Sequence, residues 1–366
     1  MIPVASPVAA YQRYRAELDA AWQRVMSSGR YILGPEVEAF EAEFAAQCGA
    51  GVAVGVANGT EAIWLALRAA GLQPGDEVLV PSLTASATAA AIVECGAVPV
   101  FADVRPSDLT LDPARLDEAL TPRTRAVVAV HLYGNPADAS GLQAFCQAHG
   151  LALIEDCAQA HGAQHAGRPV GTFGLAAAWS FYPTKNLGAF GDGGLVTTSD
   201  PAVAERLRLL REYGWRERYH SDVHGWNSRL DELQAALLRV RLAHLEEDNQ
   251  RRRAIARLYR QALPAELRSP AAASGDVGVE HLFVIRYPRR DGLRRALAEA
   301  GVGTAIQYPV PCHLQRAYQG SGAGPGSLPV TEQAVREILS LPMYPELSSA
   351  AVEQVIAAVH TALREV

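Results

Sequence analysis

Short apolar runs alternate with segments of helical spacing along the first half of the chain. Five such runs stand at residues 52–57, 76–81, 98–103, 125–134 and 151–156 (VAVGVA, DEVLVP, VPVFAD, RAVVAVHLYG and LALIED). Apolar runs of this length, bounded by turn or helical segments, are typical of buried strands. The alternation predicts an α/β fold in which a largely parallel sheet has helices on both faces.

Helical spacing is clearest in three segments. The segments at 36–49 and 60–71 (EVEAFEAEFAAQCG and TEAIWLALRAAG) each end in glycine, which often caps helices in the left-handed conformation. A longer polar helix is predicted over 231–263, and the pattern of residues that follows it differs from that of the first part of the chain. We therefore expect a large domain over residues 1–245 and a smaller C-terminal α/β domain over residues 246–366.

The composition is that of a globular chain. Its 366 residues are too many for one core of ordinary size, and an apolar fraction of 49% argues against disorder. The net charge of −6 offers no basic surface to nucleic acid. The five cysteines match neither a disulfide framework nor a zinc spacing, and no segment resembles a leader or a bilayer span. We expect reduced thiols in a cytoplasmic protein without a nucleic-acid, metal or membrane partner.

One lysine stands alone in the segment SFYPTKNLGAFGDGG (180–194), where the next charge is Asp192. Lys185 could be a solvated loop lysine, as most lysines are. If apolar neighbours desolvate it instead, its pKa falls and its neutral amine becomes a nucleophile that forms Schiff bases with carbonyl groups. That second interpretation requires a cofactor site elsewhere in the chain.

Two further segments could complete such a site. Residues 58–60 (Asn-Gly-Thr) follow a predicted strand and open a helix, so their free N–H groups could cradle a phosphate; a simple helix cap is the alternative. Asp156 ends an apolar strand, where a carboxylate is costly unless a cation such as a pyridinium meets it; the alternative is a cap for a following helix. Gln159 and His161 stand on the same turn and could reach a ligand held by Asp156.

An anion cradle, an acid for a ring nitrogen and an amine for an aldehyde match the needs of pyridoxal 5′-phosphate (PLP). Six segments in order closely resemble the nucleotide-sugar aminotransferases of the DegT/StrS type: GRYILGPEVEAFE, NGTEAI, EDCAQAHGA, SFYPTKNLGAFGDGG, GWNSRLDELQAALL and QYPVPCHLQRAY. The resemblance covers nearly the whole chain. It implies a fold-type-I PLP-dependent transferase, with a mostly parallel mixed sheet between helices in the large domain, and it implies transaminase activity.

The resemblance also implies roles for single residues. Lys185 resembles the lysine that forms the Schiff base and shuttles the proton, and Asp156 resembles the acid that keeps the pyridine nitrogen protonated. Gln159 resembles the side chain that bonds the cofactor's 3-hydroxyl, and Ala158 would pack on one ring face. The implied phosphate ligands are Gly59, Thr60, Ser180 and, from the neighbouring subunit, Asn227. The last of these implies a homodimer with shared active sites.

One position departs from much of the family. Many relatives carry an aromatic ring after the segment PSLT, where it stacks on the cofactor, and this chain has Ala85 there. Either another group covers that face of the cofactor or the ring is held more loosely.

The substrates are implied by the same resemblance. An amino donor, usually L-glutamate, and a nucleotide-linked keto sugar would react in turn, in ping-pong order. The segment REYGWRERYHSDVHGW (211–226) interleaves arginines with aromatic residues and could hold a nucleotide diphosphate sugar; a solvated basic loop is the alternative. The candidate substrate residues are Tyr31, Arg218, Tyr219, His220, Tyr308 and His313. The closest resemblance is to enzymes that aminate C3 of dTDP-3-keto-6-deoxyhexoses.

Other functions stay open at this point. The main alternative is amination at C4 of a 4-keto sugar. A dehydratase is disfavoured, because the similar dehydratases carry histidine at the position of Lys185. A PLP-binding regulatory protein without turnover would have lost its donor and sugar contacts. The run GSGAGPGS (320–327) resembles a nucleotide-binding glycine loop only superficially, since no strand leads into it, and we expect a surface loop.

Overall fold

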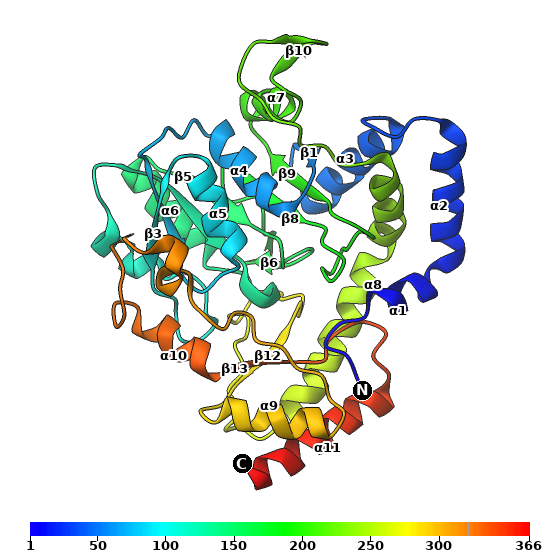
Figure 1. The fold of residues 1–366 in the computed structure, drawn as a ribbon, viewed down its shortest axis with the longest axis vertical. Coiled ribbons are helices and arrows are strands. Elements are labelled where there is room, and N and C mark those ends of the chain that lie inside the picture. Colours follow the sequence, from blue (N-terminus) through cyan, green and yellow to red (C-terminus); the bar gives the residue numbers. More distant parts are fainter. Residues whose placement is uncertain (321) are drawn as a thin grey trace.

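The computed structural model describes residues 1–320 and 322–366 of the chain. A seven-stranded sheet with the strand order β1-β9-β8-β5-β4-β2-β3 forms its centre (Figure 1). Strand β9 runs antiparallel to both of its neighbours, and the other neighbouring pairs are parallel. The prediction of an α/β fold with a mostly parallel mixed sheet is confirmed.

The strands of the central sheet are β1 (Val52–Val56), β2 (Glu77–Pro81), β3 (Val98–Ala102), β4 (Thr124–Val130), β5 (Ala152–Asp156), β8 (Ala176–Ser180) and β9 (Gly194–Thr198). Short strand pairs are β6 (Gln164–His165) with β7 (Arg168–Pro169), β10 (Trp215–Glu217) with β11 (His220–Ser221), and β12 (Phe283–Arg286) with β13 (Ile338–Leu341). The α-helices are α1 (Pro7–Arg13), α2 (Arg15–Ser28), α3 (Pro35–Cys48), α4 (Gly59–Ala69), α5 (Ser86–Glu94), α6 (Ala139–His149), α7 (Pro201–Leu210), α8 (Glu232–Ala262), α9 (Arg290–Glu299), α10 (Pro329–Glu337) and α11 (Ser349–Glu365). Short 3₁₀ helices are η1 (Pro113–Ala119), η2 (Leu132–Gly134), η3 (Cys312–Leu314) and η4 (Arg316–Tyr318).

The sheet brings segments that are distant in the sequence to one edge. Val78, Val127 and Ile154, in the middle of β2, β4 and β5, are fully buried, which explains why these runs are continuously apolar. Strands β1, β8, β5, β4 and β2 point in the same direction, so their carboxyl ends lie at one edge. Ligand sites of open α/β sheets form at that edge.

Glycines stand at the ends of the first two predicted helices. Helix α3 ends at Cys48, and Gly49 caps it in the left-handed conformation with φ 72°. Helix α4 opens under an Asn58 cap and ends at Ala69, shortly before Gly71, whose φ is +90°. Both predicted helices are confirmed.

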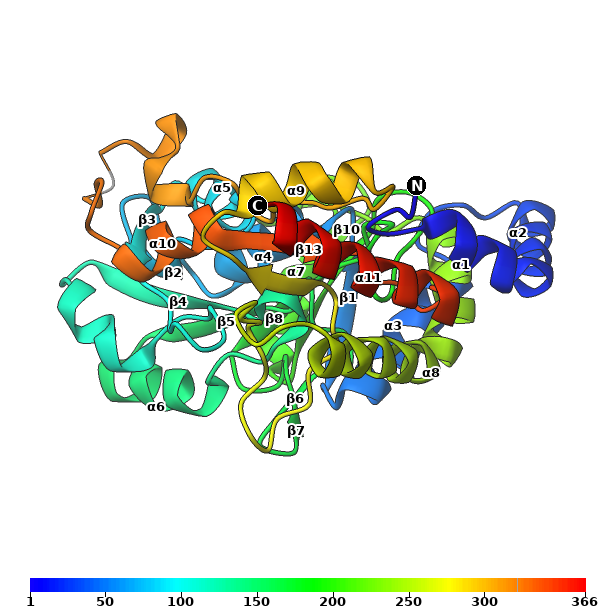
Figure 2. The same ribbon diagram turned by 90° about the horizontal axis from the view of Figure 1, so that it is seen from below.

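A smaller unit gathers around β12 and β13 at one end of the molecule (Figure 1). Helices α9 and α11 pack with this strand pair, and α8 runs beside them (Figure 2). Helix α8 passes residue 245 without a break. Its packing changes beyond that point, because Leu245 belongs to a core cluster of the central sheet and Ile255 to the core of the smaller unit.

Packing does not follow the sequence order at every point. Ile2, at the N-terminus, packs in the smaller unit, whereas Cys312 and Val335, late in the chain, pack against the core of the central sheet. The domain boundary at residue 245 therefore stays a prediction. Short segments from each side of that boundary pack in the core of the other unit.

Two segments stand out from the body of the molecule. The β10–β11 pair projects at the end opposite to the C-terminal helices (Figure 1). In the glycine run, Gly320 and residues 322–327 are exposed or half-buried and follow the short helix η4 rather than a strand; Ser321 lies outside the described residues.

Within the described ranges, no helix has the length and apolar character needed to cross a bilayer.

Candidate active site

A cavity of about 730 Å³ opens at the carboxyl edge of the sheet. One wall comes from the loops after β1, β2, β5 and β8. The opposite wall includes His281, Gln307 and Met343, which lie close to the β12–β13 pair. The cavity therefore lies between the central sheet and the smaller unit.

Lys185 lines this cavity from the loop after β8. The next residue anchors the loop, because the Asn186 amide donates to Asn249 Oδ1 at 2.8 Å and to the carbonyl of Val279 at 2.9 Å. Burial lowers the pKa of Lys185 to about 8, and the charge of Asp156 opposes part of that shift. Lys185 is half-buried, and its lowered pKa favours the desolvated amine over the solvated loop lysine.

Asp156 is the last residue of β5 and is only 5% exposed. Its Oδ2 accepts a hydrogen bond from the Thr88 hydroxyl at 2.9 Å, and its Oδ1 accepts one from the Ala158 N–H at 3.1 Å. Burial raises the pKa of Asp156, and these bonds and the Lys185 charge offset only part of the increase. No helix follows at once, so the carboxylate lines the cavity with acceptor capacity left for a cationic ligand.

Helix α4 begins at the rim of the cavity. Asn58 caps it, and its Oδ1 accepts a hydrogen bond from the N–H of Glu61 at 2.9 Å. The N–H groups of Gly59 and Thr60 have no partner among the described residues and stay available to an anion. A Cβ atom at Gly59 would lie 2.5 Å from the Cβ of Ser180, so the two backbones can approach only because residue 59 is glycine.

Gln159 connects the two walls of the cavity. Its Oε1 accepts a hydrogen bond from the Tyr133 N–H at 2.6 Å, and its Nε2 donates to the Tyr308 hydroxyl at 3.1 Å. Burial raises the pKa of Tyr308 to about 12. The hydroxyl therefore stays protonated at neutral pH and can donate a hydrogen bond to a ligand.

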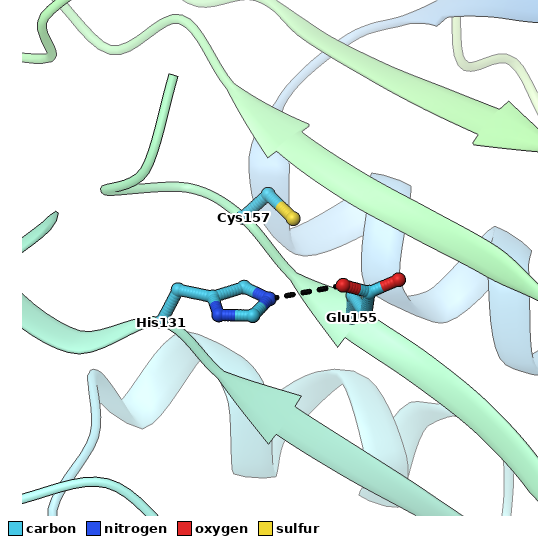
Figure 3. Close-up of side chains that lie close together, drawn as sticks. All are labelled: His131, Glu155 and Cys157. Atoms are coloured by element: carbon cyan, nitrogen blue, oxygen red, sulfur yellow. Dashed lines mark hydrogen bonds and ion pairs between the residues drawn. The ribbon is translucent and has the colours of Figure 1, made fainter. Parts of the chain in front are cut away.

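A second group of polar side chains lies beside β5, and its members stabilise the fold. The ligand atoms of His131, Glu155 and Cys157 lie within 4.8 Å of one another, a spacing that a metal ion could bridge (Figure 3). Both nitrogens of His131 are already engaged: Nε2 lies 3.1 Å from Glu155 Oε2, and Nδ1 accepts a hydrogen bond from the Ala137 N–H at 3.0 Å. Burial raises the pKa of the Cys157 thiol well above its usual range. A protonated thiol and an occupied imidazole make a poor metal site.

Comparison with known proteins identifies the family. Residues 12–360 match the DegT/DnrJ/EryC1/StrS aminotransferase family. The chain belongs to this family. It is 51% identical, over 98% of this chain and 95% of the relative, to dTDP-3-amino-3,4,6-trideoxy-alpha-D-glucose transaminase of Streptomyces venezuelae. It is also 51% identical, over 97% of this chain and 98% of the relative, to the erythromycin biosynthesis sensory transduction protein EryC1 of Saccharopolyspora erythraea.

The fold agrees with the family. A crystal structure of S. venezuelae DesV in complex with a ketimine intermediate is 51% identical to the chain and has a TM-score of 0.96; the match covers 99% of this chain and 98% of that one. The implied fold-type-I architecture and the implied PLP-dependent aminotransferase class are confirmed.

The residues at the cavity fit PLP, the cofactor of this aminotransferase family. An amine, a cavity-facing carboxylate and two free N–H groups are the partners that an aldehyde, a pyridinium nitrogen and a phosphate require. Lys185 would hold the aldehyde and Asp156 the ring nitrogen, while Gly59, Thr60 and Ser180 would hold the phosphate. Ala158 and Gln159 line the same cavity. These assignments to single residues stay predictions.

Five predicted ligands lie away from the cavity of their own chain. All five side chains are exposed and do not line it: Tyr31, Arg218, Tyr219, His220 and Asn227. The last four belong to the projecting β10–β11 segment or follow it. Within one chain, the structure therefore brings only Tyr308 of the expected substrate residues to the cofactor site.

Three further side chains in the expected substrate segments have partners of their own. His313 is buried, with its Nδ1 2.6 Å from the Ser82 hydroxyl and its Nε2 3.4 Å from Glu332, and it does not line the cavity. Arg211 forms an ion pair with Glu41 at 2.5 Å, and Arg216 forms ion pairs with two exposed carboxylates. These contacts stabilise the local structure, so none of the three is free to bind a substrate without losing a partner.

Sequence reasoning missed two features of the site. Lys185 is the only lysine among the 33 lysine and arginine residues, a signal that a residue count would have given. His281 lines the cavity, with its Nδ1 3.0 Å from Asn186 Oδ1, but no local motif marks it. Ala85 lines the cavity as expected, and the rings that line it with Ala85 belong to Tyr182, Tyr308 and His281.

Proposed function

We propose that the protein transfers an amino group from L-glutamate to C3 of a dTDP-linked 3-keto-6-deoxyhexose. Amino transfer rests on one observation: a desolvated amine, Lys185, and a cavity-facing carboxylate, Asp156, line the same cavity as two free N–H groups. The choice of C3 and of dTDP rests on the 51% identity to a relative named for a dTDP-3-amino sugar.

The residues of the chain supply binding and proton control. Bound PLP would supply an aldehyde and an electron-withdrawing ring. With a pKa of about 8, Lys185 keeps part of its population neutral near neutral pH, so it can act as a nucleophile and then move a proton at the donor's α-carbon. Asp156 would hold a proton on the ring nitrogen, and the Tyr308 hydroxyl would donate a hydrogen bond inside the cavity.

A homodimer with shared sites is part of the proposal. Tyr219 and Trp226 are 72% and 56% exposed on the projecting segment, where they offer aromatic surface to a partner. Asn227 follows them and is also exposed. Seated against a second copy, this segment would bring Asn227, Arg218 and Tyr219 to the partner's cavity, which accounts for their distance from the cavity of their own chain.

Subunit mixing tests the shared site. Lys185→Ala chains and Asn227→Ala chains, each inactive alone, are mixed under conditions in which subunits are shown to exchange. A hybrid dimer regains one intact site, so we expect up to about half of its sites to work. Activity that stays absent in the mixture would contradict the shared site, while leaving the amino transfer in place.

The substrate is tested by product analysis. The holoenzyme and glutamate are incubated separately with dTDP-3-keto-6-deoxyglucose and dTDP-4-keto-6-deoxyglucose, and NMR locates the new C–N bond. We expect the bond at C3. Faster turnover of the 4-keto sugar would overturn the choice of C3 and leave aminotransferase activity standing.

The name of one relative favours a second candidate. A sensory transduction protein, as EryC1 is named, could bind the cofactor without turning it over. Mixing the holoenzyme with glutamate alone separates the two functions. An aminotransferase changes the absorption spectrum of its bound cofactor within one half-reaction and releases 2-oxoglutarate, whereas a binding protein does neither.

A further inference from the structure

A small second cavity lies behind Lys185. Its volume is about 20 Å³. Ala5, Thr184 and Lys185 line both this cavity and the larger one, so they form the wall between the two. The roles proposed above for Lys185 involve only the larger cavity.

Two buried arginines of α8 line the small cavity. Arg241 and Arg252 are 5% and 4% exposed. Arg241 Nη1 donates to the carbonyl of Gly188 at 2.7 Å, and Arg252 Nη1 donates to the carbonyl of Met343 at 3.1 Å. The Nε atom of each arginine is buried and has no partner among the described residues. A buried N–H donor without a partner is costly, so both atoms call for a ligand.

The third polar group is a carboxylate. Glu346 lines the same cavity, and its Oε1 is buried without a partner in the described part of the chain. No nitrogen of Arg241 or Arg252 lies within 4.0 Å of it. Asp248, on the same helix, does not line this cavity, and its Oδ1 accepts a hydrogen bond from the Tyr14 hydroxyl at 2.8 Å. Three residues of opposite charge, each with a buried atom that has no partner among the described residues, thus line one small cavity.

We propose that one water molecule fills this cavity, accepts hydrogen bonds from Nε of Arg241 and Arg252 and donates one to Glu346, and that Glu346 thereby positions Lys185. A single water needs roughly 10–15 Å³ and two to four polar partners. The cavity offers about 20 Å³ and is lined by three residues that each carry an unpartnered buried atom, which suits a water.

The water would join the two walls of the active site. Arg241 holds the carbonyl of Gly188, three residues after Lys185. Arg252 holds the carbonyls of His281 and Met343, whose side chains line the opposite wall. A bridge from both arginines to Glu346 fixes the loop of Lys185 relative to that wall. The site itself stands on the structure alone, and only its effect on catalysis rests on the proposed function.

A high-resolution crystal structure of the holoenzyme tests the site directly. We expect one ordered water within hydrogen-bond distance of Arg241 Nε, Arg252 Nε and Glu346 Oε1. An empty cavity, a direct ion pair of Glu346 with either arginine, or an anomalous signal at this position in crystals grown with bromide would overturn the proposal.

Two substitutions of Glu346 test the positioning. Glu346→Met keeps the length of the side chain but removes the acceptor, whereas Glu346→Gln keeps an acceptor oxygen for the water. The readout is the single-turnover rate with glutamate per bound cofactor. We expect Glu346→Met to lower this rate on the order of tenfold with unchanged affinity for glutamate, because a small misplacement of the amine slows the proton transfer. Glu346→Gln should keep most of the rate.

The matched control is Glu353→Met, the same change at an exposed position of α11. It should leave the rate unchanged. A Glu346→Met enzyme with the full rate per bound cofactor, or equal losses in the Met and Gln variants, would contradict the positioning role. If the unmodified protein did not react with glutamate at all, the proposed function would fail, and the crystallographic test of the water would still stand.

Discussion

Glu155 and Asp156 are neighbours on β5, and both are buried, yet they do opposite work. Glu155 accepts hydrogen bonds from the backbone N–H groups of residues 171, 173 and 174 and pairs with His131. Burial alone would raise its pKa, but these partners outweigh burial and lower the pKa. Asp156 has two hydrogen bonds, a raised pKa and a cavity in front of it.

The two carboxylates differ in how many further hydrogen bonds their oxygens can accept. A buried carboxylate whose oxygens are fully engaged holds the chain together, and it has nothing left for a ligand. A buried carboxylate with few partners is unstable until something cationic arrives. Successive residues of a strand point to opposite faces, so one strand end can provide both.

The largest expected effect is at Lys185, which lines the same cavity as Asp156. Lys185→Ala should lower turnover by at least about a thousandfold, because the only nucleophilic amine of the site is lost. It should also abolish the covalent link to the cofactor that borohydride reduces. Because Lys185 is the only lysine, mass spectrometry after reduction should find the cofactor at this residue in the unmodified protein. A variant that retained more than a small fraction of the normal rate would refute the assignment.

The next effect separates the two carboxylates. Asp156→Asn keeps the shape of the side chain and removes the charge, and we expect turnover to fall by roughly a hundredfold, about 2.7 kcal/mol in the activation free energy. The urea denaturation midpoint should hardly change. Unaltered turnover in Asp156→Asn would contradict the role of Asp156 in catalysis.

Glu155→Gln should show the reverse pattern. One carboxylate oxygen of Glu155 would become an NH₂ group, which would then lie against the backbone N–H groups that now donate to it. We therefore expect the free energy of unfolding to fall by about 2 kcal/mol. Urea denaturation measures this loss, and turnover per folded molecule should stay within about twofold of normal. A stable Glu155→Gln protein with impaired chemistry would show that the two roles had been assigned to the wrong residues.

The smallest effect is a shift in a titration. NMR of the apoprotein with isotope-labelled lysine should give a single side-chain signal with a pKa of about 8, below the usual value of about 10.4. In Asp156→Asn the pKa should fall further, because the carboxylate raises it. Since the folded pKa lies below the unfolded one, the apoprotein binds fewer protons than the unfolded chain between about pH 8 and 10.4, and its stability should rise with pH there. A signal that titrates near 10.4 would contradict the burial of the amine.

Much of the fold was predictable because its signals are local. The continuous apolar run that ends at Asp156 is buried on both faces of its strand, and a glycine such as Gly49 ends a helix by its own conformational freedom. Parallel strands then require crossover helices, so the order of elements leaves few topologies. The segments around Lys185 and Asp156 could be found in the same way, since each follows such a strand.

Contacts that depend on distant segments could not be predicted. Tyr308 reaches Gln159 across 149 residues, and no local pattern sets that distance. Tyr219 and Asn227 stand in a segment whose composition suited a substrate site, but the fold carries that segment away from its own cavity.

By itself, the sequence determined five apolar strands, the three clearest helices and the residue types at the strand ends, because hydrophobic spacing and backbone preference act over a few residues. Only the tertiary structure decided which of those residues share a space. It placed Asp156 before a cavity and surrounded Glu155 with donors, although the two are adjacent in the chain. It also set Arg241, Arg252 and Glu346 around one small void behind Lys185. Burial and hydrogen-bond partners depend on every element that packs nearby, and they set the pKa values on which the chemistry depends.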